Sequence, residues 1–230
     1  MKSFLFTSIE VPNIVDDAKG RVIWLNKKGE EADFSAKAAT NVLCIDSPKV
    51  SWWRLIWYSQ CVPKQSFILW LAIQDRLSTQ DKLVKWGMHT VNRCALCKCD
   101  NEDLQHLFFK CAYSAEVWDK AKNMADITYE NCEWYGLIMR LANDCINKNI
   151  GWIVRRLVFA ACVYFLWQER NGRIFRDNQN SSQEIYNKVV ENVKYRLAGI
   201  TVKDSSNVRK VEDKWMVKCK RIGGEYGKGK

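Results

Sequence analysis

Three cysteines and one histidine in the middle of the chain have the spacing of metal ligands. Cys94 and Cys97 are separated by two residues, His106 follows after eight more, and Cys111 comes four residues after the histidine. Two cysteines this close let one tight turn direct two thiolates at one ion, and Zn²⁺ takes four sulfur or nitrogen ligands in a tetrahedron. We therefore predict one zinc ion held by these four residues. Its role is predicted to be structural, because no coordination position stays open for chemistry.

Other residues near the array bear on the same ion. Cys99 could replace Cys97 as a ligand, but its neighbours Lys98 and Asp100 indicate a loop, so we predict either a free thiol or one that supports the site without binding the ion. His89, the second of only two histidines, has no cysteine at a suitable spacing and is expected to be exposed or to cap a helix. Three thiolates and one neutral imidazole leave a zinc site with a net negative charge. Nearby cations can offset that charge: Arg93, Lys98 and Lys110.

The step from His106 to Cys111 predicts how helices position the array. Five residues turn an ideal α-helix by about 500°, which leaves the two side chains roughly 140° apart. The two ligands cannot share one face of a continuous helix. We therefore predict a turn of helix carrying His106, a break near Lys110, and a new helix that begins near Cys111 and covers 112–124.

The remaining pattern predicts a mainly α-helical protein with a small N-terminal β-hairpin and a C-terminal helical extension. The hairpin is expected from strands at 21–25 and 32–35 around a turn at 26–30. Apolar residues at helical spacing predict a helical hairpin over 63–87, which begins at a proline and ends at a glycine. Further helices are predicted at 36–44, 52–57, 135–146, 150–175 and 183–197.

These elements predict four regions along the chain. A β-hairpin and short helix occupy 1–47, a zinc-binding domain occupies 48–125, a helical region occupies 126–200, and a basic tail predicted to be disordered occupies 201–230. The net charge is +10 and the pI is about 9.1. Residues 168–230 hold 15 Lys and Arg against 8 Asp and Glu, so most of the excess lies there. Such a basic segment favours a polyanionic partner, although a solvated terminus is the alternative.

The cysteines and the longest apolar run predict where in the cell the protein is found and whether it spans a membrane. Six cysteines are scattered singly, and Met1–Phe6 begins too short an apolar stretch for a signal peptide. We therefore expect reduced thiols in an intracellular protein. The longest apolar run, residues 157–167, is short of the roughly 20 residues that span a bilayer. It is predicted to be a buried core helix, and no membrane partner is expected.

A longer pattern of apolar, aromatic and charged residues surrounds the array. It includes Phe67-x₂-Trp70, Arg76-Leu77-x-Thr79-x-Asp81-x-Leu83, Trp86-Gly87, Glu102-x₃-His106-Leu-Phe-Phe and Val117-Trp118. The flanks add Trp24, Phe34-Ser35, Lys37-x-Ala39 and Trp167-x-Glu169-Arg170-Asn171-x-Arg173-x-Phe175. This pattern resembles the zinc-binding domain at the C-terminal side of plant LINE-type reverse transcriptases, over about residues 20–176. Two positions depart from the family: Ala32-Asp33 replaces a frequent Gly, and Ala112 replaces a frequent Pro. Neither is a ligand.

The resemblance implies an accessory domain that helps a retroelement protein hold RNA or DNA, with the nucleus as one place of action and the cytoplasm as another. Polymerase chemistry needs carboxylates around two Mg²⁺ ions. The Asp16-Asp17 pair lacks the aromatic residue of the polymerase hairpin and the sequence of a palm domain before it. We therefore expect no enzyme activity and no small-molecule substrate. The alternative function is a structural or protein-interaction domain that zinc stabilises.

Basic residues on the predicted helices are candidates for contact with phosphate. They are Arg76, Lys82 and Lys85 on the helical hairpin and Arg170, Arg173 and Arg176 on the later helix. For each of them an ordinary surface charge is the alternative. Trp86 could stack on a base but is predicted to lie in the core, and Glu102, Asp103 and Asp144 are predicted to be surface charges.

Overall fold

The chain divides into two compact units, Met1–Pro48 and Lys49–Lys230. The computed structural model describes residues 23–26, 28–43, 50–129, 133–144, 149–176 and 178–222. Helices dominate these residues, and the sheets among them have two strands each. The predicted fold class, mainly α with a small N-terminal hairpin, is confirmed. The pair Asp16-Asp17, the first residues of the predicted hairpin and the end of the tail after Ile222 lie outside the described residues.

The first unit contains a β-hairpin followed by a short helix: β1 (Trp24–Leu25), β2 (Glu31–Ala32) and α1 (Ala36–Leu43). The strands pair antiparallel. The Asn26 side-chain oxygen closes the turn by accepting hydrogen bonds from the backbone N–H groups of Lys28 and Glu30. Gly29 has a φ of 78°, a conformation that favours glycine. The Ser35 hydroxyl accepts a hydrogen bond from the Ala38 backbone N–H in the first turn of α1 and so caps this helix.

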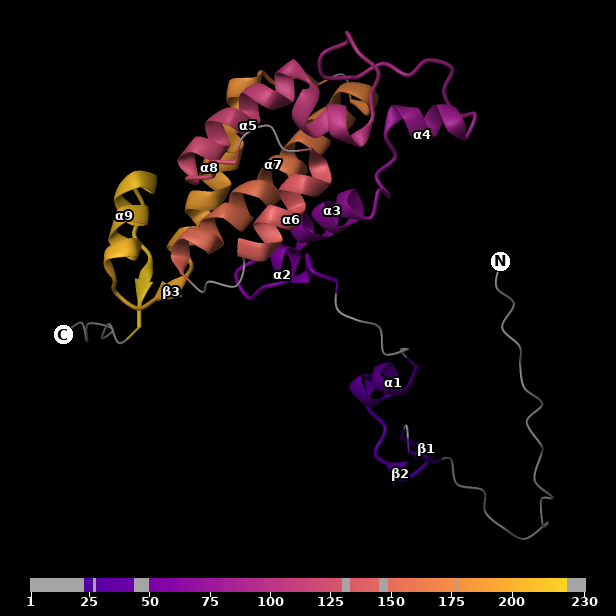
Figure 1. Cartoon of the computed structure of the whole chain (residues 1–230), viewed down its shortest axis with the longest axis vertical. Helices are drawn as coiled ribbons and strands as arrows, with labels where there is room; N and C mark the ends of the chain where they lie inside the picture. The colour runs from indigo at the N-terminus through magenta and orange to yellow at the C-terminus, as the bar shows by residue number, and fades with distance from the viewer. Residues whose placement is uncertain are drawn as a thin grey trace. The chain divides into compact units, whose positions relative to one another are not determined.

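The second unit is a helical assembly that carries the predicted metal ligands (Figure 1). Its elements are α2 (Trp53–Ile56), α3 (Pro63–Ile73), α4 (Gln80–Lys85), the π-helix η1 (His106–Lys110), α5 (Ala112–Met124), α6 (Trp134–Asp144), α7 (Ile150–Phe175), α8 (Ser182–Ala198), β3 (Thr201–Val202), α9 (Ser206–Trp215) and β4 (Lys220–Arg221). The helical hairpin predicted over 63–87 is α3 and α4. The helix predicted over 150–175 has the predicted bounds.

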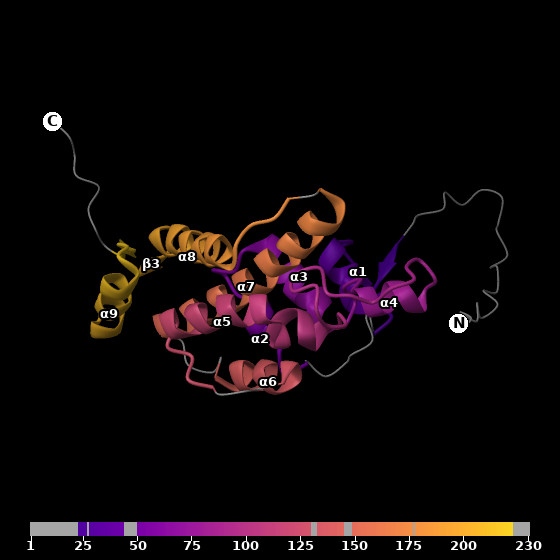
Figure 2. The ribbon, with the colours of Figure 1, turned by 90° about the horizontal axis from the view of Figure 1, so that it is seen from above.

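The central helix of this unit is α7, which contacts α2, α3, α5, α6, α8, α9 and η1 (Figure 2). Residues 157–164 are all buried, as expected for a helix that is apolar on every side. By length and composition α7 could cross a membrane, and 61% of its most apolar stretch is buried inside the fold. Its packing is that of a core helix, as the sequence predicted.

The C-terminal segment differs from the predicted disordered tail. Residues 201–222 contain α9 between β3 and β4, and these two strands pair in parallel. Ser205 caps α9 through a hydrogen bond from the Val208 backbone, and Trp215 is 1% exposed. Glu212 is buried and accepts hydrogen bonds from the Arg221 guanidinium and the Cys219 backbone. The basic composition suggested disorder, but the segment is ordered by one buried carboxylate, Glu212, and one buried indole, Trp215.

Protonation of Glu212 is expected to loosen this C-terminal segment. Hydrogen bonds from Arg221 and from the Cys219 backbone lower the pKa of Glu212 from 4.5 to about 2. A carboxyl group with a lowered pKa stabilises the fold fully above its unfolded pKa, and this contribution is lost as the pH falls through the folded pKa. Hydrogen exchange in α9 should therefore be faster in Glu212→Gln than in the parent at pH 7. The difference should shrink between about pH 4.5 and 2; a difference that is constant over this range would contradict the prediction.

Candidate metal centre

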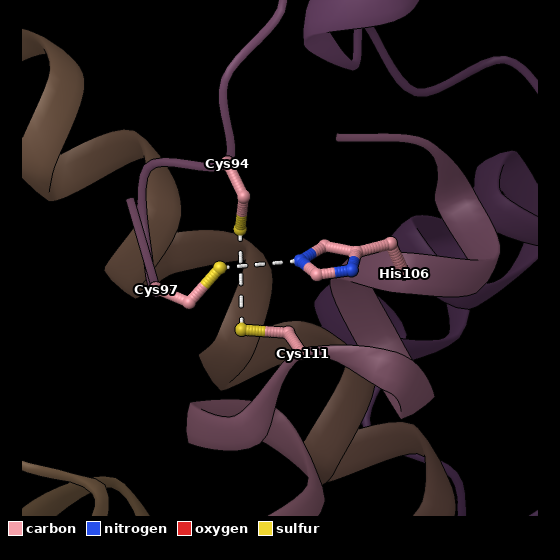
Figure 3. A group of neighbouring side chains, drawn as sticks. All are labelled: Cys94, Cys97, His106 and Cys111. Carbon is pink, nitrogen blue, oxygen red and sulfur yellow. Dashed lines mark hydrogen bonds between the residues drawn. The ribbon is translucent and has the colours of Figure 1, made fainter. Parts of the chain in front are cut away.

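The turn that carries the first two ligands is folded back on itself by backbone hydrogen bonds. The Cys94 N–H donates to the Asp100 carbonyl at 2.8 Å, and the Lys98 N–H donates to the Cys94 carbonyl at 2.9 Å. Lys98 has a φ of 59°, in the left-handed region that tight turns use. The result is that the sulfurs of Cys94 and Cys97 point toward one centre (Figure 3).

The other two ligands come from the two ends of η1. His106 begins the π-helix, and Cys111 follows it with an extended ψ of 126° as the N-cap of α5. The Cys111 N–H donates to the His106 carbonyl at 2.8 Å, five residues back. Such a wide turn brings residues five apart closer to one face than an α-helix does. The predicted break near Lys110 is confirmed, and the π-turn is the device that lets both ligands face the same point.

The four ligand atoms lie within 4.8 Å of one another. The sulfurs of Cys94 and Cys111 are 3.9 Å apart, and the Cys97 sulfur lies 3.3 Å from His106 Nε2 (Figure 3). A tetrahedral zinc ion with Zn–S bonds of about 2.3 Å places two sulfurs roughly 3.8 Å apart. Three thiolates and one imidazole are also a donor set that zinc prefers. The cluster therefore fits one zinc ion with a complete coordination sphere.

The surroundings of Cys111 favour the thiolate that a metal requires. The Cys94 thiol donates a hydrogen bond to the Cys111 sulfur, and this shared proton lowers the pKa of Cys111 while it raises the pKa of Cys94; zinc binding displaces the protons of both thiols. Backbone N–H groups of Tyr113 and Ser114, in the first turn of α5, also lower the pKa of Cys111. A helix N-terminus that faces a sulfur is a common way to stabilise a thiolate. This end of α5 is therefore prepared for metal binding.

Cys99 lies outside the cluster of four. It is exposed, its thiol donates to the Cys97 carbonyl at 3.2 Å, and its N–H donates to the Cys97 sulfur at 3.5 Å. An N–H group directed at a sulfur stabilises the thiolate that would bind zinc. The structure thus gives Cys99 a supporting backbone contact and leaves its own thiol free, as predicted. His89 is exposed and is not in the cluster either.

A buried ion pair joins the zinc turn to α7. Glu102 and Arg170 are 0% and 1% exposed, and the Glu102 carboxylate accepts three hydrogen bonds from the Arg170 guanidinium, at 2.8 and 3.1 Å to one oxygen and at 3.4 Å to the other. The same carboxylate accepts from the backbone N–H of Gln80 at the start of α4 and, at 3.4 Å, of Ala95 in the zinc turn. The Arg170 guanidinium also stacks on the Trp167 ring. One carboxylate therefore connects α4, the zinc turn and α7.

Arg173 makes a second link between α7 and the zinc turn. Its guanidinium donates to the Leu96 carbonyl at 2.7 Å, to the Asn180 carbonyl at 2.9 Å and to the buried Glu169 carboxylate at 2.7 Å. It also lies over the Tyr113 ring at the start of α5. The planar guanidinium therefore donates hydrogen bonds to three different acceptors at once.

Two sequence predictions fail here for a physical reason. Arg170 is not available to a phosphate because its guanidinium is buried against Glu102, and Arg173 is held inside the fold by three acceptors. Glu102 is not a surface charge, since it is 0% exposed. The signal that could have found them is the joint presence of Glu102 and Glu169-Arg170 in the longer motif pattern, because a buried carboxylate needs a buried cation.

The other residues predicted to contact phosphate differ in their exposure to solvent. Arg76, Lys85 and Arg176 are exposed. The Lys82 ammonium is 14% exposed and bonds to Asp75 and to the Leu77 carbonyl, so it closes the α3–α4 turn. Trp86, predicted to be core, is instead 59% exposed at the C-terminal end of α4, next to the exposed Lys85.

Comparison with known proteins agrees with this centre. Residues 34–118 match the family of zinc-binding domains in reverse transcriptase, and this range includes all four ligand candidates and ends within α5. A curated protein of Arabidopsis thaliana, "Putative ribonuclease H protein At1g65750", is 23% identical over 176 residues. The alignment covers 73% of this chain but 27% of that relative, so the chain spans about a quarter of the relative's length.

No solved structure matches the chain. The assignment therefore rests on two independent observations, the family match and the converging ligand atoms. Over residues 34–118 the chain is similar to the zinc-binding domain of reverse transcriptases, and its Cys₃His cluster fits one zinc ion.

Proposed function

We propose that this chain is a zinc-stabilised accessory module that binds RNA or DNA and has no polymerase chemistry of its own. The observation that carries the proposal is that the α3–α4 hairpin exposes two basic side chains and one indole, those of Arg76, Lys85 and Trp86, and the Lys85 ammonium also lies 3.7 Å from the Asp81 carboxylate. Basic side chains contact phosphates, and an exposed indole offers a stacking face to an unpaired base. The origin that we propose is a plant LINE-type retroelement protein, and the proposed location is intracellular, including the nucleus.

The zinc centre supports this surface through α4. The Glu102 carboxylate and carbonyl accept hydrogen bonds from the backbone N–H groups of Gln80 and Asp81, which lie in the first turn of α4. Glu102 lies between the two halves of the metal array, so the position of the hairpin depends on the same loop that carries the ligands. Loss of zinc should therefore disturb this surface as well as the metal site.

A salt titration with a short single-stranded oligonucleotide tests the proposal. Affinity for the zinc-loaded protein should fall steeply between low and physiological salt, since phosphate contacts release counterions. The variant Arg76→Ala/Lys85→Ala should bind more weakly, and the slope of log K against log salt should decrease by about 0.7 per lost contact on a single strand. Trp86→Ala should weaken binding to single strands more than binding to a duplex.

A charge-matched control separates a local surface from net charge. Lys203 and Lys210 are exposed and lie in the C-terminal segment, so Lys203→Ala/Lys210→Ala removes the same two charges elsewhere. Equal loss of affinity in the two double variants would mean that binding follows net charge alone. Absence of any salt-dependent binding by the zinc-loaded parent would overturn the proposal.

The second candidate function is a protein-interaction domain, and one observation favours it. The loop after α4 exposes two further apolar side chains, Met88 at 68% and Val91 at 63%, beside Trp86. Exposed apolar residues that cluster in this way are typical of protein-binding surfaces. A chain that holds zinc but binds no polynucleotide at low salt would favour this function over nucleic-acid binding.

A further inference from the structure

A second candidate site lies between the C-terminal part of α7 and the start of α8, outside the matched range 34–118. It is a pocket of about 530 Å³, within the size range of small-ligand sites. The two helices lie side by side along much of their length, and the connection between them turns back at this end of α7 (Figure 2). None of the four zinc ligands lines it.

The charges around this pocket favour an anion. Its carboxylate, Glu169, is already satisfied by Arg173 at 2.7 Å and by the backbone and side-chain N–H groups of Asn180 at 2.9 and 2.7 Å. Two cations also line the pocket, Arg176 and Lys188. Arg176 is exposed and has no ion pair or side-chain hydrogen bond among the described residues, and the Lys188 ammonium bonds to the neutral Asn180 side chain. Lys188 also acts on the Glu184 carboxylate, whose pKa it lowers, so Arg176 is the cation among the described lining residues that remains for a ligand.

The uncharged lining favours a flat polar group. Side-chain amides are contributed by Gln168, Asn171 and Asn178, and amides can pair with the hydrogen-bonding edge of a nucleobase. Phe175 lines the pocket and is 70% exposed, so its ring offers a stacking face. Ile185, 1% exposed, is an apolar residue of the lining. The cations can contact the phosphate of one nucleotide, the amides can contact the edge of its base, and the aromatic ring can stack on the face of the base.

We propose that this pocket holds one unpaired nucleotide of a single-stranded nucleic acid. The proposal deepens the proposed function and rests on it. The Phe175 ring stacks on the base, the amides contact its edge, and Arg176 with Lys188 contact the phosphate. The α3–α4 hairpin supplies a separate contact surface, so loss of one site weakens binding without abolishing it.

A glycine in the lining allows a direct test by filling the pocket. A Cβ atom added at Gly172 would meet only the Asn178 carbonyl, at 3.7 Å, which is ordinary contact. Gly172→Leu therefore has room for its Cβ atom, and leucine also favours the helix more than glycine does. It should bind a short single strand about tenfold more weakly than the parent, since one stacked base is lost. Gly172→Ala is the matched control and should bind as the parent does.

A second pair of variants tests the stacking face. Phe175→Ala removes an exposed ring, so the fold should be unaffected, and affinity for the single strand should again fall about tenfold. Tyr195→Ala removes an aromatic ring that is 84% exposed on α8 and does not line the pocket. It should leave affinity unchanged. Equal effects of Phe175→Ala and Tyr195→Ala would overturn the assignment of Phe175.

Three probes separate failure of this proposal from failure of the proposed function: a short single strand, the duplex of the same sequence, and a mononucleotide. If the parent binds the strand and Gly172→Leu binds it equally well, the pocket proposal is overturned and the proposed function stands. If the parent binds no strand, the proposed function fails, and a mononucleotide that binds the parent but not Gly172→Leu identifies a free-nucleotide pocket instead. Duplex binding that Gly172→Leu weakens as much as single-strand binding would also overturn the proposal.

Discussion

Removal of zinc should unfold residues 90–118. Metal binding to small zinc sites supplies on the order of 10 kcal/mol of folding free energy at neutral pH. That amount is comparable to the whole stability of an ordinary domain. Within this range residues 94–103 form a loop, which the metal ligands hold together with the Glu102–Arg170 and Leu96–Arg173 contacts to α7. A strong chelator, or the variant His106→Ala, is therefore expected to expose this segment to protease while the contacts of α7 with α3 and with α8 persist.

The second histidine provides the control for this prediction. His89 is exposed and outside the cluster, so His89→Ala should keep the parent's resistance to protease and its urea midpoint. Limited proteolysis followed by mass spectrometry of the fragments locates the cleavage sites. Cleavage in chelator that is unchanged from the zinc-loaded protein would contradict the prediction, because core packing alone would then hold the segment.

Replacing Arg170 by methionine should destabilise the second unit by about 3–5 kcal/mol. The change leaves the Glu102 carboxylate buried without its cation, and breaking a buried pair on one side has a cost of this size. Glu102 is 0% exposed and also bonds to the backbone of α4 and of the zinc turn, so it cannot move to water without disturbing both. Urea unfolding of the zinc-loaded protein measures the loss.

Two further variants show whether the effect comes from the unpaired charge. In Glu102→Gln/Arg170→Met neither charge remains, so a large part of the lost stability should return. Arg209 forms an ion pair with Asp204 in which the side chains are 69% and 44% exposed, and Arg209→Met should have little effect on stability because water screens an exposed pair. If Arg170→Met is no more destabilising than Arg209→Met, the buried pair does not hold the zinc turn to α7.

The sequence was most informative where local spacing decides the structure. The four ligand positions, the break between His106 and Cys111 and the bounds of α7 all follow from residues a few positions apart. The geometry of the break was only partly predictable: a change of helix was expected, but the π-turn of η1 was not. A π-turn has no composition of its own that distinguishes it from the end of an α-helix.

Contacts between distant segments were not predictable from single residue types. Glu102 and Arg170 are 68 positions apart, and each alone has the character of a surface charge. They are buried because α7 packs against the zinc turn and brings Arg170 onto Glu102. The prediction for Trp86 is wrong for the opposite reason: a tryptophan is usually predicted to be core, whereas this one lies at the C-terminal end of a short helix and is 59% exposed.

The C-terminal segment shows a third limit. The sequence predicts a disordered tail over 201–230, yet Ser205 is the N-cap of α9, and the following Val208, Val211 and Trp215 have helical spacing. Polar residues that cap a helix and polar residues that form a loop have the same composition. What stabilises the helix here is the hydrogen bond from Arg221 to Glu212, and Arg221 lies in the sequence beyond the end of α9.

Zinc content by native mass spectrometry tests the central claim most directly. The parent, Cys99→Ala and His106→Ala/Cys111→Ala are purified without added metal and compared. We predict one zinc ion in the parent and in Cys99→Ala, and none in the double variant. A well-folded parent that carries no zinc, or a double variant that keeps it, would contradict the assignment of Cys94, Cys97, His106 and Cys111 as the metal centre.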